Sequence, residues 1–268
     1  MTINIGCVCN YDYLPHFFKM AYRASMVLSD YRIHLLYVCE DETQSFKAKL
    51  KEVLHEDYCT TVGFLLKNPE VRRVEESGRL MLYDWLRAGM CGYFNLDHCL
   101  YLDVDCDIVG DFSDTYNALV NNGTSIAAPP DLTASGDVQQ EVAKHCNSRE
   151  VYSIGAVWMN TDLRADLEDI MRFCMVDIKG GFCPGMSVWN ILMHRRAGLN
   201  DFTALPPTFS CNWYAGEANV RYTDILQYGG RFKELHQYAN YEYNGEDAPH
   251  TIIINHEKMV DVDMSNWG

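Results

Sequence analysis

The chain has 268 residues, a formal net charge of −15 and 48% hydrophobic residues, so it can bury a substantial core. The negative charge argues against binding to nucleic acid or to an anionic membrane surface, because both require clustered Lys and Arg. No stretch approaches transmembrane length, and the amino terminus lacks the pattern of a signal peptide. The eleven cysteines are scattered, without a Cys-x-x-Cys pair, so we expect reduced thiols in a cytoplasmic protein.

Strand and helix patterns alternate from the amino terminus onward, which predicts an α/β fold with a parallel sheet. In chain order, we expect a strand at 3–9, a helix at 15–28, a strand at 32–39, helices at 43–55 and 79–88, strands at 99–102, 125–128 and 153–159, helices at 163–175 and 188–196, and a strand at 251–255. No linker or repeat divides the chain, so we expect a single domain over residues 1–268. The weakly patterned stretch 129–150 is interpreted as a functional or mobile loop.

Three carboxylates at alternate positions follow the apolar strand at 99–102. Residues two apart in an extended chain share a side, so Asp103, Asp105 and Asp107 can converge at the carboxyl end of that strand, where open α/β sheets bind ligands. Carboxylate oxygens suit a hard divalent ion such as Mn2+ or Mg2+ that leaves positions open for phosphate oxygens. The alternative is a solvated acidic turn.

Two other acidic motifs fit less well. An EF-hand loop starting at Asp103 would require Gly at its sixth position, where the chain has Ile108, and Glu at its twelfth, where it has Asp114. A phosphatase-type Asp-x-Asp nucleophile usually lies near the start of a chain, and no supporting Lys and acidic pair stands out downstream.

The segment Tyr101-Leu102-Asp103-Val104-Asp105, preceded by Asp84-Trp85-Leu86-Arg87, resembles motifs of the retaining nucleotide-sugar glycosyltransferases of the Rossmann-like GT-A fold. The likeness is to glycosyltransferase family 8 and to the sugar-transferase domains of large clostridial toxins and arginine-modifying effectors. It implies an α/β fold with a mixed, mainly parallel sheet flanked by helices. It also implies that Asp103 and Asp105 bind Mn2+ or Mg2+ against the diphosphate of a UDP-sugar, with Asp103 also near the ribose.

In the toxin-like branch, the pair corresponding to Asp84 and Arg87 holds the donor sugar. Helical spacing of three places both side chains on one face, where Asp can accept bonds from sugar hydroxyls and Arg can donate. The alternative is an ordinary surface ion pair, which contributes little to stability.

Further resemblance lies at Asn10 and Tyr11, which follow the first strand where the family contacts the nucleotide. The Tyr11 ring can stack on uracil or pack over the first helix, and the sequence leaves both open. The segment Tyr152 to Asn160 resembles the family strand that supplies a donor-sugar contact, here at Ser153. The chain departs from the pattern at Ile154, and at Met186, Ser187 and Val188, which stand in place of the usual Asp-Gln-Asp.

The carboxy-terminal residues Ser265-Asn266-Trp267 resemble the Ser-x-Trp of the toxin-like branch. The likeness implies that Ser265 lies near the metal, and that the Trp267 indole donates to the diphosphate as part of a lid. His256 matches the family 8 position of the third metal ligand, whereas Asp261 or Asp263 lies nearer the toxin-like one, so the third ligand stays open.

The sequence therefore predicts a metal-dependent retaining glycosyltransferase, moving a hexose or N-acetylhexosamine from a UDP-sugar to an unidentified glycan, protein or small-molecule acceptor. Residues 1–120 would form the nucleotide-binding half, and residues 121–268 the acceptor half with the lid. Two alternatives are a catalytically reduced nucleotide-sugar-binding protein, suggested by the missing Asp-Gln-Asp, and a GT-A-fold nucleotidyltransferase. The latter would need a Gly-rich, basic loop after the first strand, and residues 9–15 contain neither Gly nor Lys.

Overall fold

The computed structural model describes residues 1–10, 13–39, 59–65, 79–178, 184–212, 222–228, 239–242 and 251–254. The strands are β1 (Ile3–Cys9), β2 (Tyr31–Cys39), β3 (Cys59–Leu65), β4 (Cys99–Leu102), β5 (Cys106–Ile108), β6 (Ile126–Ala128), β7 (Ala156–Met159), β8 (Phe202–Ala204), β9 (Ser210–Asn212), β10 (Ile225–Gln227), β11 (Ala239–Glu242) and β12 (Thr251–Ile254). The helices are α1 (Leu14–Val27), α4 (Arg79–Ala88), α5 (Met90–Phe94), α6 (Ser113–Asn122), α7 (Gly136–Cys146), α8 (Arg164–Ile178) and α9 (Pro184–Gly198).

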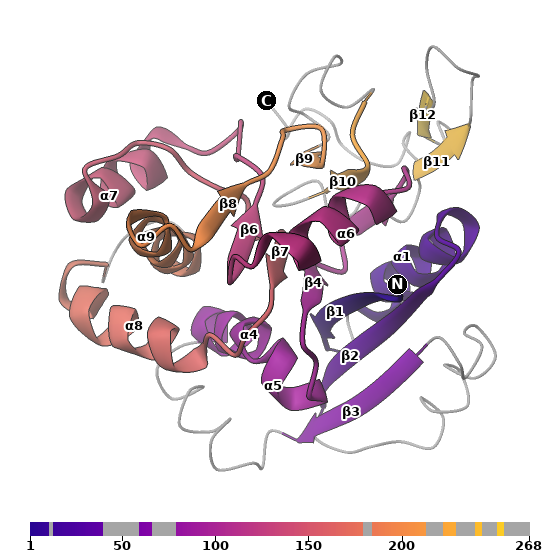
Figure 1. Cartoon of the computed structure of the whole chain (residues 1–268), viewed down its shortest axis with the longest axis horizontal. Coiled ribbons are helices and arrows are strands. Elements are labelled where there is room, and N and C mark those ends of the chain that lie inside the picture. The colour runs from indigo at the N-terminus through magenta and orange to yellow at the C-terminus, as the bar shows by residue number, and fades with distance from the viewer. Residues whose placement is uncertain are drawn as a thin grey trace, which may run out of the picture.

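The largest sheet of the described residues has seven strands in the order β3-β2-β1-β4-β7-β6-β8 (Figure 1). Its strands are parallel except β7, which runs antiparallel to both β4 and β6. β4 and β7 are buried at every position, and β1 at every position except Asn4, because helices cover both faces of the sheet. The mixed, mainly parallel sheet expected from the sequence is therefore confirmed.

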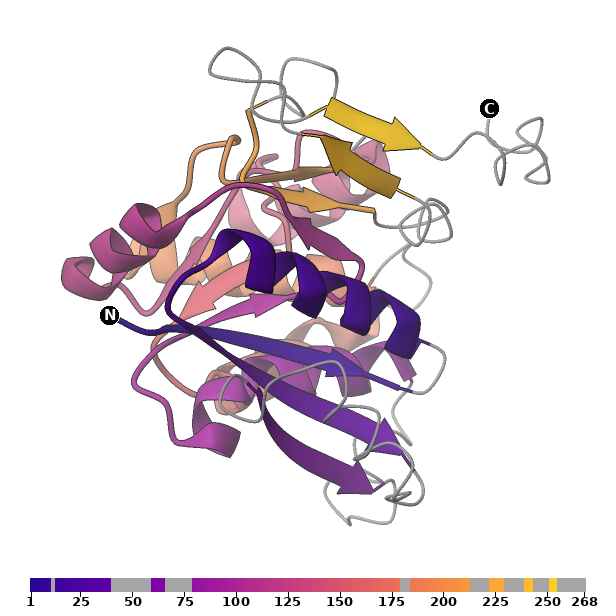
Figure 2. The ribbon, with the colours of Figure 1, turned by 90° about the vertical axis from the view of Figure 1, so that its right-hand side faces the viewer.

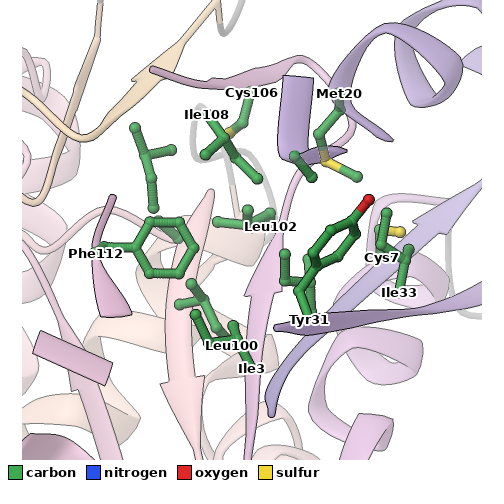
Figure 3. Close-up of a cluster of buried hydrophobic side chains, with 14 of the residues drawn as sticks. Ile3, Cys7, Met20, Tyr31, Ile33, Leu100, Leu102, Cys106, Ile108 and Phe112 are labelled. Atoms are coloured by element: carbon green, nitrogen blue, oxygen red, sulfur yellow. The ribbon is translucent and has the colours of Figure 1, made fainter. Parts of the chain in front are cut away.

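One face of the sheet packs against α1 and α6. Helix α1 begins with Pro15 in its first turn and buries Phe17, Met20, Ala21 and Ala24 at helical spacing. Figure 2 shows α1 lying along the sheet, and Figure 3 shows Met20 beside core residues of β1, β2 and β4. Side chains alternate between the two faces along a strand, so Val8 of β1 points to the opposite face, where α4, α5, α8 and α9 pack.

Two smaller sheets lie outside the main one. β5 pairs antiparallel with β10, and β10 pairs parallel with β9. β11 and β12 form an antiparallel pair. The small sheet β5-β10-β9 is important for the site, because β5 follows the acidic motif directly and β10 brings residues from the last quarter of the chain beside it.

The strands and helices expected at 3–9, 15–28, 32–39, 79–88, 99–102, 125–128, 163–175, 188–196 and 251–255 are confirmed, with ends shifted by a few residues. The helix expected at 43–55 lies outside the described residues. The interpretation of 129–150 as a loop is wrong, because α7 occupies residues 136–146. Ser135 caps α7 by accepting from the Val138 backbone N–H at 3.4 Å, and Val138 and Val142 are buried.

Several elements were not expected at all. These are β3, α5, β5, α6, β8, β9, β10 and β11. Most of them are strands of three or four residues, which are too short to show a hydrophobic period. The strand expected at 153–159 begins only at Ala156, since residues 153–155 form a turn. None of the described helices is long and apolar enough to cross a membrane.

Candidate functional site

The sequence-predicted residues gather at the carboxyl edge of the central strands. β1 and β4 are parallel neighbours, so Asn10 after β1 and Asp103 after β4 lie at the same edge. β7 runs the opposite way and begins at that edge, which brings Ser153 and Gly155 there. The Asp103 N–H donates to the Gly155 carbonyl at 2.9 Å, joining the end of β4 to the turn before β7.

The Asp103 carboxylate is the centre of a polar cluster. Its Oδ1 accepts from the Tyr101 hydroxyl at 2.7 Å and from Arg87 Nη2 at 2.9 Å. Its Oδ2 accepts from Gln227 Nε2 at 3.4 Å. The charge-assisted bonds to Oδ1 fix the carboxylate plane, which leaves Oδ2 as the oxygen with fewer donors.

The Arg87 guanidinium is buried, with only 6% of the residue exposed. It lies 4.5 Å from the Tyr101 ring centre and 5.8 Å from that of Trp189, and its Nη1 is 3.4 Å from Asp84 Oδ1. Burial alone would lower the Arg87 pKa, but the neighbouring Asp103, Tyr101 and Asp84 raise it above its ordinary value. The surface-pair alternative is therefore wrong, and Arg87 is a permanent internal cation of the site.

Asp84 shares that single cation with Asp103. It is 7% exposed, and its pKa is raised to about 6, because burial and the nearby Asp103 carboxylate together outweigh the opposing effect of Arg87. Asp84 also lies against the first turn of α9, where a Cβ on Gly185 would be 2.0 Å from Asp84 Oδ2. A carboxylate near the amino-terminal end of a helix interacts favourably with the helix dipole.

Gln227 belongs to this cluster, although the sequence did not single it out. Its Oε1 accepts from the Ser153 hydroxyl at 3.2 Å, while its Nε2 donates to Asp103. Ser153 also accepts from the Gly155 N–H at 3.3 Å. The expected donor-sugar residue Ser153 is therefore linked to the expected metal ligand Asp103 through Gln227. Gln227 lies 124 positions from Asp103 along the chain, so no local sequence pattern marks it as part of the cluster.

Asp105 and Asp107 have different surroundings. Asp105 is 2% exposed, and its backbone carbonyl accepts from the Tyr228 N–H at 3.0 Å. Asp107 lies on β5, fully buried, and its Oδ2 is 3.3 Å from Lys19 Nζ on α1. The expected convergence of Asp107 with the other two acids is corrected accordingly, since Asp107 has its counter-charge within the fold.

The chemistry of the donor set fits a hard divalent cation in part. Asp103 and Asp105 offer carboxylate oxygens on one turn, and such ions are commonly bound by one or two carboxylates plus phosphate oxygens and water. Within the described ranges, no three His, Cys, Asp or Glu side chains gather as a metal site. The candidate third ligands His256, Asp261 and Asp263 lie outside those ranges, as do Tyr11, Ser265 and Trp267.

Asn10 and the first turn of α9 are the remaining described parts of the expected site. The Asn10 Oδ1 is buried and has no hydrogen-bond partner among the residues that the structure describes, consistent with a ligand contact. At the start of α9, Met186 packs against the small apolar cluster of α7, and Ser187 and Val188 are buried. Asn190, one turn further, accepts from the Tyr152 N–H at 2.6 Å and so holds the segment that leads to Ser153.

Comparison with solved structures identifies the fold as that of GT-A glycosyltransferases. The galactosyltransferase LgtC, solved with donor and acceptor sugar analogues, aligns with a TM-score of 0.64 and 13% identity over 85% of this chain and 88% of LgtC. Mouse xyloside xylosyltransferase 1 aligns with a TM-score of 0.59 and 12% identity over 86% of this chain and 98% of the mouse chain.

A third neighbour is the glycosyltransferase GlyE of Streptococcus pneumoniae TIGR4, with a TM-score of 0.58 and 15% identity over 87% of this chain and 56% of GlyE. No protein-family model matches the sequence, and no curated protein sequence matches it either. At this level of identity the likeness establishes the fold, and the activity has to be argued from the site.

Proposed function

We propose that the protein is a metal-dependent retaining glycosyltransferase that moves a hexose or N-acetylhexosamine from a UDP-sugar to an acceptor. The observation that carries the proposal is the Asp103 cluster at the carboxyl edge of the sheet, with Arg87 on one carboxylate oxygen and Gln227 on the other. A position of this kind, at the carboxyl ends of parallel strands, is where open α/β sheets bind nucleotides. Solved neighbours with the same fold are glycosyltransferases.

Each residue has a proposed role. Asp103 and Asp105 would hold Mn2+ or Mg2+, which supplies Lewis-acid stabilisation of the leaving diphosphate. Arg87 keeps a fixed positive charge beside Asp103, in a buried environment where it costs little reorganisation when negative charge develops on the donor. Ser153 and Asp84 would contact donor-sugar hydroxyls, and Asn10 the nucleotide.

The two halves of the expected domain both contribute to this site. Asp84, Arg87 and Asp103 come from residues 1–120, and Ser153 and Gln227 from residues 121–268. The contacts of Tyr11, His256, Asp263, Ser265 and Trp267 with the donor and the metal remain part of the proposal, with Trp267 as a lid over the diphosphate that excludes water.

A donor panel tests the proposal directly. The protein is incubated with each common nucleotide sugar and Mn2+, and the released nucleoside diphosphate is measured with and without a chelator. We expect turnover of a UDP-sugar that chelation abolishes and that Asp105→Asn loses. Asp137→Asn, which changes an exposed carboxylate in the first turn of α7, is the matched control and should retain full turnover. Turnover by Asp105→Asn in the presence of chelator would refute the metal site.

The second candidate is a nucleotide-sugar-binding protein with reduced catalysis. It is favoured by the start of α9, where the usual acids are absent and Ser187 and Val188 are buried instead. The two candidates differ in one measurement, because a binding protein takes up UDP and Mn2+ in a calorimetric titration but releases no UDP from any donor in the panel.

A further inference from the structure

Gln227 is the side chain that joins two parts of the proposed site. It lies on β10, far along the chain from both of its partners, and bonds to Asp103 through Nε2 and to Ser153 through Oε1. The two bonds also fix which end of the amide is which. A carboxylate can only accept, so the NH2 group faces Asp103, and the carbonyl oxygen is then left to accept from the Ser153 hydroxyl.

The space that the amide occupies is made by a glycine. A Cβ on Gly155 would lie 1.9 Å from Gln227 Nε2, 2.3 Å from Cδ and 2.5 Å from Oε1. Any larger residue at 155 would displace the amide from its place. Gly155 is itself held to the acidic motif, because its carbonyl accepts from the Asp103 N–H.

The backbone of β10 is anchored to the same motif. Gln227 pairs with Cys106 in the antiparallel ladder between β10 and β5, and the next residue, Tyr228, donates to the Asp105 carbonyl at 3.0 Å. The Gln227 side chain therefore starts from a backbone position that is fixed relative to Asp103 and Asp105. A side chain built on paired strands is held more firmly than one on a free loop.

The chemistry of an amide suits this position. Arg87 and Tyr101 already bond to Asp103 Oδ1, so Oδ2 is the oxygen that can turn toward a ligand. A second cation at Oδ2 would neutralise the carboxylate and weaken its attraction for a metal ion. A neutral N–H donor orients Oδ2 and leaves the negative charge in place, as outer-shell hydrogen bonds do for metal-binding carboxylates.

We propose that Gln227 is a positioning residue, which orients Asp103 for a metal-bound nucleoside diphosphate and couples Asp103 to Ser153. The inference rests on the proposed nucleotide-sugar site. It deepens that proposal by naming the residue that would make Asp103 and Ser153 act as one unit.

The test is a calorimetric titration of UDP with Mn2+ into the full chain, together with kcat and KM for the active donor. Gln227→Met keeps the length of the side chain and removes both hydrogen bonds. We expect it to weaken Mn2+–UDP binding about tenfold, which is typical of outer-shell changes at metal sites. Gln140→Met is the matched control on the exposed face of α7 and should bind as the wild type does. Wild-type affinity in Gln227→Met overturns the inference.

Two further variants separate positioning from packing. Gln227→Asn keeps an amide and adds no charge, but its side chain is one carbon shorter and cannot reach both Asp103 and Ser153, so it should also weaken Mn2+–UDP binding. The double variant with Ser153→Ala and Gln227→Met should lose no more affinity than Gln227→Met alone, since Ser153 acts through the glutamine. Wild-type affinity in Gln227→Asn, or additive losses in the double variant, would overturn the inference. If Gln227→Met fails to fold, Gln227→Asn decides.

The outcome is distinguishable from failure of the proposed function. If the wild type turns over a donor and Gln227→Met has the same kcat, KM and affinity, the role of Gln227 is refuted. The glycosyltransferase proposal then stands. A wild type that releases no UDP from any donor, yet binds Mn2+–UDP in a Gln227-dependent manner, refutes the transferase and supports the inference. A wild type that does not bind Mn2+–UDP refutes both.

Discussion

The buried position of Arg87 predicts a large effect on stability when its charge is removed. Arg87→Met keeps most of the apolar stem. It deletes the guanidinium, whose carbon lies 4.5 Å from the Tyr101 ring centre and 5.8 Å from that of Trp189. Breaking an exposed ion pair costs about 0 to 1 kcal/mol. Breaking a buried one costs about 3 to 5 kcal/mol, because the remaining partner is left as an uncompensated charge. With Asp103 at 2.9 Å and Asp84 at 3.4 Å, Arg87 belongs to the second case.

The pH dependence follows from Asp84. Its folded pKa of about 6 lies above the ordinary value of 3.8, so the cost of burying the ionised form is complete above pH 6 and is lost as the pH falls from about 6 toward 3.8. Removing Arg87 raises this pKa further. We therefore expect the loss of stability in Arg87→Met to be largest near pH 8 and smaller at pH 5, where Asp84 is protonated and only Asp103 lacks its partner.

Urea unfolding followed by circular dichroism measures the effect at both pH values. Arg172→Met is the matched control, because Arg172 also pairs with two carboxylates, Glu168 at 3.5 Å and Asp169 at 3.6 Å, but its side chain is 74% exposed. We expect the control to lose about 1 kcal/mol or less. Equal losses in the two variants, or a loss in Arg87→Met that grows as the pH falls, would refute the reasoning from burial.

Two further predictions follow from single contacts. Burial lowers the His34 pKa to about 4, so the stability contributed by neutral His34 is complete above pH 6.5 and is lost as the pH falls toward 4. His34→Gln, which keeps a donor for Asn4 Oδ1, should show a shallower fall of the urea midpoint in that window, and parallel curves for variant and wild type would contradict this. Gly185→Ala places a Cβ 2.0 Å from Asp84 Oδ2 and should cost about 1 to 3 kcal/mol in thermal unfolding. Gly136→Ala is the control, because a Cβ at that position meets no atom within 4 Å, and it should leave the stability unchanged or raise it. Equal melting temperatures for Gly185→Ala and Gly136→Ala would contradict the expected clash, because they would show that Asp84 moves aside freely.

The elements with strong local patterns were predictable from the sequence. β1, β2 and β4 are apolar runs of the length of a strand, and α1 shows helical spacing after a proline, so their type depends on residues close together in the chain. The same local pattern located Asp103 and Asp105 after a buried strand, and thereby the edge of the sheet where the candidate site lies. The short strands and α7 were missed, because their pairing or packing partners are distant in sequence.

Only the tertiary structure decided which partner each polar side chain has. The spacing of Asp84 and Arg87 is compatible with a surface ion pair, but α4 packs against β1, α8 and α9, and this packing buries the pair. Alternation suggested that Asp107 shares a site with Asp103, whereas contact between α1 and β5 pairs it with Lys19. Gln227 reaches Asp103 across 124 positions because β10 pairs with β5. Local sequence determines the period of a strand or helix, but burial and charge pairing depend on which distant segments pack together, and these set the chemistry of the site.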